Sequence, residues 1–178
     1  MRPDAGDENR GLPADAIALL IARGLTVAAA ESLTGGLVTA ALTTVPGSSA
    51  AVRGGVVAYA ADLKNVLLGV DAELLARAGT VDRDVALGMA KGARERLGAS
   101  VGVATTGVAG PEPAEGKPVG TVHIAVSMAG LARHEALMLA GDRAAIRRGT
   151  VDRVLRLLVA TLKEDAAEGC GADADGRQ

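Results

Sequence analysis

The sequence predicts a single-domain, three-layer α/β/α protein with a mixed β-sheet. Short apolar segments typical of buried strands alternate along the chain with amphipathic segments typical of helices. The apolar segments show no polar alternation, so helices are expected to cover both faces of the sheet. The length of 178 residues suits one domain, and 49% hydrophobic with 22% charged residues is typical of a globular chain.

The first half of the chain alternates helices and strands whose ends carry clear signals. A helix begins at Pro13, which a first helical turn accepts, and stops before Gly24. The next helix is opened by Gly35 and Gly36 and ends before Pro46. The predicted elements are helix 13–23, strand 25–30, helix 35–43, strand 55–59 and helix 61–68.

The second half begins with the strongest helical pattern, in which Asp82 caps a helix that Gly98 stops. Three strands follow, and a turn at residues 129–130 predicts that the last two form a hairpin, which makes the sheet mixed. A long helix with one apolar face ends the pattern. The predicted elements are strands 101–106, 121–128 and 134–139 and helix 142–162.

One folded unit is expected over residues 12–163, between flexible polar ends at 1–11 and 164–178. Cys170 is the only cysteine, which excludes an intrachain disulfide and a cysteine-rich metal site. No apolar run is long enough for a bilayer span or a signal peptide. We therefore expect a cytoplasmic protein without membrane contact.

The composition argues against direct binding of nucleic acid. The chain has one tyrosine and no phenylalanine or tryptophan, so it offers almost no aromatic surface for stacking bases. Its formal charge of −2 gives no net attraction for phosphate backbones. A small-molecule ligand is the better expectation.

Three predicted strands run into small, polar, glycine-bearing turns, at residues 31–36, 59–64 and 105–111. In parallel α/β sheets, ligands bind where such strand ends converge. The first turn sets Ser32 before the N–H groups of Thr34, Gly35 and Gly36, which can face an oxyanion or a phosphate. The competing interpretation is that Ser32 or Thr34 only caps the following helix.

Lys64 is one of four lysines in a chain that otherwise uses arginine for positive charge. A buried lysine can act as a base and activate a serine, which arginine cannot do. Tyr59 precedes it and can relay a proton or orient a substrate. On spacing alone, a solvated lysine and an amphipathic filler tyrosine remain alternatives.

The other polar residues carry weaker signals. Arg143, Arg147 and Arg148 open the last helix and can neutralise a phosphate, or can simply be solvated. His123 and His134 lack the partners of a metal site, and we expect packing or surface roles for them. The sequence predicts no bound metal.

Several motifs resemble one known family when they are taken together. They are AESLTGGLVTAALTTVPGSS, then GGVVAY with LK and LLGV after it, then TTGVAGP with KPVGTV. In this order, from about residue 14 to 162, they resemble the CinA C-terminal-domain family, the nicotinamide-nucleotide amidohydrolases. The chain looks like the stand-alone form, without the molybdopterin-binding-like domain of longer members.

The resemblance implies hydrolysis of nicotinamide mononucleotide to nicotinic acid mononucleotide and ammonia, in pyridine-nucleotide salvage, without metal or organic cofactor. It implies Ser32 as nucleophile, Lys64 as its base and Tyr59 as a helper. Residues implied to hold the substrate are Thr34, Gly35, Gly36, Ser48, Thr106, Gly107 and Arg143. Related proteins tend to be oligomeric, so a homo-oligomer is expected.

The chain departs from the family pattern at several positions. Leu33 stands where members usually have cysteine, Asp82 where serine is typical, and Ala60 and Ala61 where a Ser-Asn pair is common. Residues 112–115 read Glu-Pro-Ala-Glu in place of a Gly-Gly pair, which predicts a stiffer, more acidic loop that disfavours an anionic phosphate.

Two other function classes remain open at this point. A non-catalytic nucleotide-binding module would keep the pocket while the altered loops prevent turnover. An interaction partner in DNA uptake or repair is suggested only by the family's competence-related name, and the charge and missing aromatics argue against direct contact with DNA.

Overall fold

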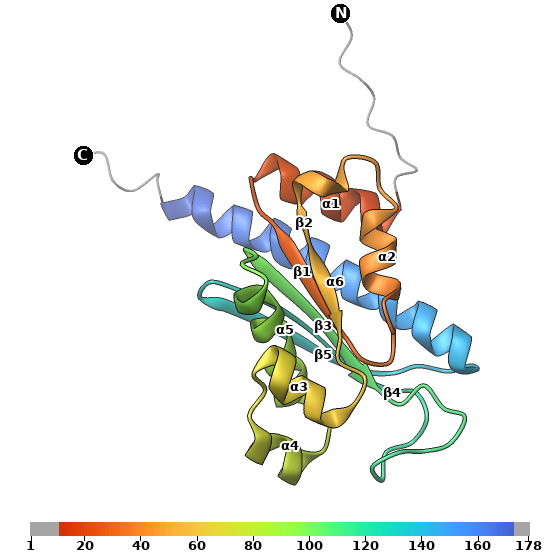
Figure 1. Cartoon of the computed structure of the whole chain (residues 1–178). Coiled ribbons are helices and arrows are strands. Elements are labelled where there is room, and N and C mark those ends of the chain that lie inside the picture. The colour runs from red at the N-terminus through yellow and green to blue at the C-terminus, as the bar shows by residue number, and fades with distance from the viewer. Residues whose placement is uncertain (1–10, 173–178) are drawn as a thin grey trace, which may run out of the picture.

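The computed structural model describes residues 11–172, and the expected flexible segment 1–11 lies almost wholly outside them (Figure 1). Figure 1 shows helices packed around a twisted sheet. The elements are α1 (Leu12–Ala22), β1 (Val27–Glu31), α2 (Leu37–Thr43), a 3-10 turn (Ser48–Ala50), β2 (Val52–Val57), α3 (Ala61–Leu68), α4 (Ala72–Ala78), α5 (Arg83–Arg96), β3 (Val101–Gly107), β4 (Thr121–Met128), β5 (Leu131–Met138) and α6 (Arg143–Ala172).

The sheet is mixed, as predicted. Its strand order is β2-β1-β3-β4-β5, with β1 parallel to both β2 and β3. Strand β4 is antiparallel to β3 and forms the predicted hairpin with β5. The three parallel strands therefore end at one edge of the sheet, which is where α/β proteins place their ligands.

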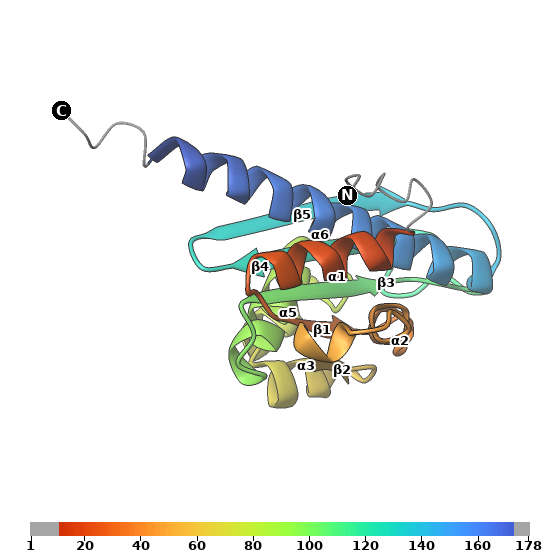
Figure 2. The ribbon, with the colours of Figure 1, turned by 90° about the horizontal axis from the view of Figure 1, so that it is seen from above.

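Two helical layers cover the sheet and confirm the three-layer architecture. Figure 2 shows α1 and α6 on one side and α3 and α5 on the other. One core cluster joins the apolar faces of α1, α2 and α6 to the sheet, and the second joins α3 and α5 to the opposite face. The second cluster is rich in alanine, which lets α5 lie close to β1, β3 and β4.

The largest differences from the predicted elements lie where burial is partial. Helix α4 was not predicted, because none of its residues is fully buried and only Leu74 and Leu75 pack partly against the core. Strands β2 and β5 begin three residues earlier than predicted. They are the two outermost strands of the sheet, and their residues are only partly buried, so their first residues do not form an apolar run.

The last helix continues past the predicted end at residue 162. It reaches Ala172, so the tail expected from residue 164 is helical up to that point, and residues 173–178 lie outside the described part. Arg23 holds the extension by donating to the Leu162 carbonyl at 2.7 Å and pairing with Asp165. Among residues 11–172, no helix is long and apolar enough to cross a membrane.

Candidate active site

Three parallel strands bring the predicted polar turns together. The register of β1 pairs Glu31 with Val57 of β2 on one side and Thr105 of β3 on the other. The pairing continues past the strand, because the Ser32 N–H donates to the Thr105 carbonyl at 3.0 Å. Ser32 thus lies where the ends of β1, β2 and β3 meet.

Ser32 and Lys64 form a buried pair, as the family resemblance implies. Lys64 Nζ lies 3.2 Å from Ser32 Oγ and donates to the Ala58 carbonyl at 2.8 Å. Helix α3 carries Lys64 under the strand ends, and its side chain is only 1% exposed. The alternative of a solvated surface lysine is therefore wrong.

Burial lowers the pKa of Lys64 from its ordinary value of 10.5, and the charge of Glu115 opposes that shift. No carboxylate among the described residues pairs with this amine within 4 Å. The Ala58 carbonyl can only accept, so it takes one N–H of Lys64. A neutral amine then has its lone pair available for the hydroxyl proton of Ser32.

Glu31 organises the turn that follows Ser32, a role that sequence reasoning missed. Its buried carboxylate accepts the N–H groups of Gly36 at 2.9 Å, Val38 at 3.0 Å and Thr39 at 2.8 Å, and the Thr39 hydroxyl at 2.7 Å. A negative charge at the start of α2 is favourable, because the helix end carries unpaired N–H groups. Gly55 has no side chain where Thr39 approaches, since a Cβ there would lie 2.0 Å from its hydroxyl oxygen.

We expect Glu31→Gln to destabilise the fold by about 3 kcal/mol. The NH₂ group of glutamine is a donor, so it would face N–H donors and leave them without an acceptor. Thr39→Val, which removes one of the four bonds, is expected to cost about 1 kcal/mol. Urea unfolding of both variants measures the difference. A loss below about 1 kcal/mol for Glu31→Gln would contradict this account.

The N–H groups predicted to face an oxyanion are largely occupied. Gly36 donates to Glu31, and Gly35 donates to the Ser32 carbonyl at 3.1 Å. The Glu31 carboxylate therefore occupies the start of α2, where a phosphate was expected to bind. The N–H groups of Leu33 and Thr34 have no partner among the described residues, although both residues are buried.

The predicted threonines tie the strand ends to their surroundings. Thr34 Oγ1 lies 2.7 Å from Thr105 Oγ1, which joins the Ser32 turn to β3. Thr106 Oγ1 donates to the Thr80 carbonyl at 2.7 Å, beside the start of α5. Both side chains are fully buried, so these two bonds fix the floor of the site.

Tyr59 and Arg143 meet at the surface. Arg143 donates to the Tyr59 hydroxyl at 2.9 Å and to the Gly110 carbonyl at 2.7 Å, so it links the ends of β2 and β3 to α6. Tyr59 is 60% exposed, and no hydrogen bond among the described residues joins it to Ser32 or Lys64.

Ser48 lies away from the Ser32–Lys64 pair, and Gly107 contributes backbone only. Ser48 precedes β2, and Ala51, which donates to the Ser48 carbonyl, accepts the N–H of Val27. Ser48 therefore lies near the amino end of β1, about 16 Å of strand from Ser32. Helix α2 carries the chain back to the start of the strands, which places Ser48 away from Ser32. Gly107 pairs with Val122 inside the sheet, where a Cβ would collide with β4.

The acidic loop holds one of its carboxylates, that of Glu115, in a fixed position. Glu115 accepts the Thr80 N–H and hydroxyl, both at 2.7 Å, and the Val81 N–H at 3.3 Å. Burial alone would raise the pKa of Glu115, but these hydrogen bonds and the charge of Lys117 outweigh it and lower the pKa. Glu115 therefore fastens the 110–120 loop to the segment between α4 and α5.

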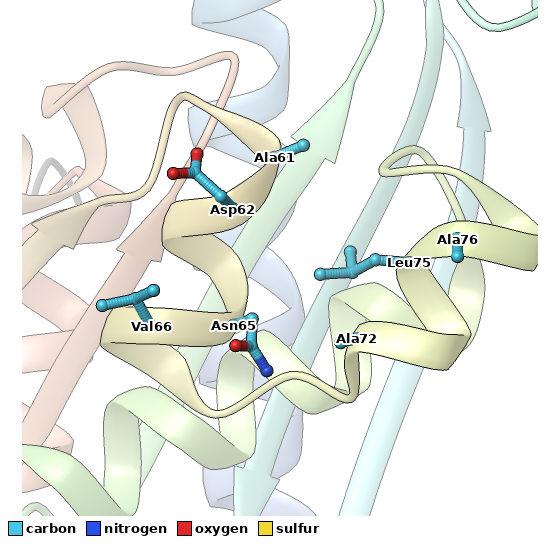
Figure 3. Close-up of a pocket in the computed structure, with 7 residues that line it drawn as sticks. All are labelled: Ala61, Asp62, Asn65, Val66, Ala72, Leu75 and Ala76. Atoms are coloured by element: carbon cyan, nitrogen blue, oxygen red, sulfur yellow. The ribbon is translucent and has the colours of Figure 1, made fainter.

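Two further features lie apart from the Ser32–Lys64 pair. A groove of about 360 Å³ separates α3 from α4 and is lined mainly by apolar side chains, as Figure 3 shows, with none of the predicted site residues among them. His123 Nδ1 and His134 Nε2 lie 2.9 Å apart on β4 and β5, and burial lowers the pKa of both. Within the described part of the chain, no cluster of three potential metal ligands occurs.

The fold and the site together define a three-layer α/β protein with a buried serine–lysine pair at the ends of its parallel strands. The family model of the CinA C-terminal domain matches residues 9–162. The chain belongs to this family.

Known relatives agree with this assignment. A CinA-like protein of Frankia casuarinae is 48% identical over 153 residues, which is 86% of this chain and 35% of that protein. The chain spans about a third of the length of the curated relatives it matches.

Crystal structures of related proteins have the same fold. The competence/damage inducible protein CihA of Agrobacterium tumefaciens is 40% identical, with a TM-score of 0.79 over 86% of this chain and 97% of that chain. A CinA superfamily protein of Klebsiella pneumoniae 700603 is 33% identical, with a TM-score of 0.83 over 86% of this chain and 96% of that chain.

Proposed function

We propose that the protein is a serine–lysine amidohydrolase that converts nicotinamide mononucleotide to nicotinic acid mononucleotide and ammonia. The observation that carries this proposal is the buried Lys64 amine, 3.2 Å from Ser32 Oγ and with a lowered pKa. Burial without an ionic partner disfavours the charged form of a lysine. Lysines with a pKa lowered in this way are common at active sites, where the neutral amine activates a nucleophile.

The reaction takes two steps through an acyl-enzyme. Ser32 Oγ attacks the carboxamide carbon while its proton passes to Lys64 Nζ. The tetrahedral intermediate then breaks its C–N bond, and Lys64 returns the proton to the departing ammonia. In the second step Lys64 takes a proton from water, and the resulting hydroxide attacks the ester carbon. The bond between that carbon and Ser32 Oγ then breaks, Lys64 returns the proton to Oγ, and the acid leaves.

The surface pair of Arg143 and Tyr59 is our candidate for the phosphate of the substrate. Arg143 makes no ion pair among the described residues, so its charge is available to an anion. Two hydrogen bonds already hold its guanidinium, to Gly110 and Tyr59, and a held guanidinium loses less freedom on binding.

Incubation with nicotinamide mononucleotide tests the function directly. We expect stoichiometric ammonia together with a product whose mass reflects replacement of the amide nitrogen by oxygen. Other amides, such as free nicotinamide and the riboside, show whether the phosphate is required. Saturable binding without any ammonia over hours would instead support a non-catalytic nucleotide-binding module.

Glu115→Gln is expected to move the acid limb of the kcat/KM profile to lower pH, by less than about one unit. The catalytic form of Lys64 is the neutral amine, so activity falls as the pH drops through its pKa. Glu115 raises that pKa, and removing its charge therefore lowers it further.

Thr80→Ala is the matched control, because it removes one hydrogen bond to Glu115 and keeps the charge. Its acid limb should coincide with that of the wild type. A shared shift in both variants, or none in Glu115→Gln, would show that the Glu115 charge does not act on Lys64.

A further inference from the structure

Arg147 reaches the nucleophile turn from the opposite end of the chain. Its Nε donates to the Leu33 carbonyl at 2.9 Å, and its terminal nitrogen donates to the Thr34 carbonyl at 2.8 Å. The guanidinium is planar and rigid, so two such bonds fix both carbonyls at once. Within the described residues, Arg147 makes no ion pair with a carboxylate.

Gly35 makes this approach possible. It has a φ of +59°, and a Cβ there would lie 3.3 Å from the Arg147 nitrogen. A side chain at this position would be strained and would press against the guanidinium. The turn is therefore built to receive Arg147.

Holding these carbonyls determines where the neighbouring N–H groups point. The peptide bonds of this turn are trans, and in a trans peptide the oxygen and the hydrogen point in opposite directions. The Leu33 carbonyl faces Arg147, so the Thr34 N–H points away from it. The Thr34 carbonyl also faces Arg147, which turns the Gly35 N–H back to the Ser32 carbonyl.

The same relation fixes the Leu33 N–H. The Ser32 carbonyl accepts from Gly35, so the N–H of the same peptide unit, that of Leu33, points the other way. The two N–H groups directly after Ser32 thus remain without a partner among the described residues. Leu33 is 4% exposed and Thr34 is fully buried. A buried N–H group without an acceptor destabilises the fold, and a ligand oxygen that accepts from it removes this cost.

We propose that Arg147 is a positioning residue that keeps the Leu33 and Thr34 N–H groups free to bind the oxyanion formed when Ser32 attacks an amide. This rests on the proposed function, and it replaces the Gly35 and Gly36 donors expected from the sequence. Donors held in place before reaction stabilise the transition state more than the substrate. The effect should therefore fall on kcat.

Steady-state hydrolysis of nicotinamide mononucleotide by Arg147→Met tests the proposal. We expect kcat to fall about 10²-fold or more, with KM changed by less than about threefold. Arg147→Lys, which keeps the charge and can hold one carbonyl, should recover part of the loss. Arg156→Met, on an exposed side of α6, is the matched control and should behave as wild type.

Labelling by a fluorophosphonate separates this proposal from the function, because it needs the nucleophile and the oxyanion donors but no amide substrate. Slower labelling of Ser32 in Arg147→Met supports the proposal even if the wild type releases no ammonia. Wild-type kcat and labelling rates in a folded Arg147→Met overturn it and leave the function standing. Unfolding of both Arg147 variants would assign a structural role only, and an unlabelled, inactive wild type would overturn both proposals.

Discussion

Ser32→Ala is expected to lower ammonia release by about 10⁴-fold or more while the protein stays folded and still binds the nucleotide. The substitution removes the oxygen that we propose as the nucleophile. It leaves the Lys64 amine bonded to the Ala58 carbonyl, and it leaves the backbone bond between Ser32 and Thr105 in place. The small hydroxyl makes no other side-chain hydrogen bond among the described residues.

The measurement combines ammonia release, product mass and calorimetric binding of nicotinamide mononucleotide. Ser127→Ala is the matched control, because Ser127 is also buried but lies within β4. Its turnover should equal that of the wild type. Full turnover by Ser32→Ala would remove the nucleophile assignment, whereas loss of binding together with turnover would point to a collapsed turn.

The fold could be predicted because its buried strands are continuous apolar runs in the sequence. Strands β1, β3 and β4 are almost entirely buried and are read directly from their apolar runs. Helix α3 was predicted to the residue, since Gly69 ends it in the left-handed conformation. Helix α4 was missed because it is short and only Leu74 and Leu75 pack against the core, which is too few residues to give a periodic pattern. Its capping residue, Asp71, is one of many aspartates.

The contact between Ser32 and Lys64 follows from the order of the strands, whereas the residues that support it could not be predicted in this way. Ser32 and Lys64 follow adjacent parallel strands, so the topology alone brings their turns to one edge. Glu31 looks like any charged residue at a strand end, and only the meeting of three strands with α2 buries it. Arg147 is 113 residues from the carbonyl of Thr34 that it holds, and no local pattern carries such a contact.

The positions of two expected features depend on the three-dimensional path of the chain, which no local pattern specifies. Ser48 follows the Pro46-Gly47 turn, and helix α2 returns it to the amino end of the parallel strands. The predicted acidity of the 112–115 loop assumed a free carboxylate. The backbone N–H groups of Thr80 and Val81 instead hold the Glu115 carboxylate by hydrogen bonds, which favour its charged form and fix its position.

Lys64→Met is expected to reduce kcat by about 10⁴-fold, because methionine fills the same space but cannot accept the proton of Ser32. Lys91→Met, at an exposed position on α5, is the matched control and should keep wild-type kcat. Turnover near the wild-type level in Lys64→Met would exclude Lys64 as the base.

The same variant is expected to change how stability depends on pH. In the wild type the pKa of Lys64 is lower in the folded state than the ordinary 10.5 of an unfolded lysine. Between these two pKa values the unfolded chain binds the extra proton, so wild-type stability rises with pH, by at most about 1.4 kcal/mol per unit. Lys64→Met has no proton to release on folding and loses this rise.

Urea unfolding across that window measures the difference between the two proteins. The stability of the wild type relative to Lys64→Met should increase as the pH is raised towards 10.5, whereas Lys91→Met should run parallel to the wild type. A constant difference at all pH values would mean that Lys64 folds in its charged form. An amine charged in the folded state has no lone pair for Ser32, so that result would also remove the basis of the proposed mechanism.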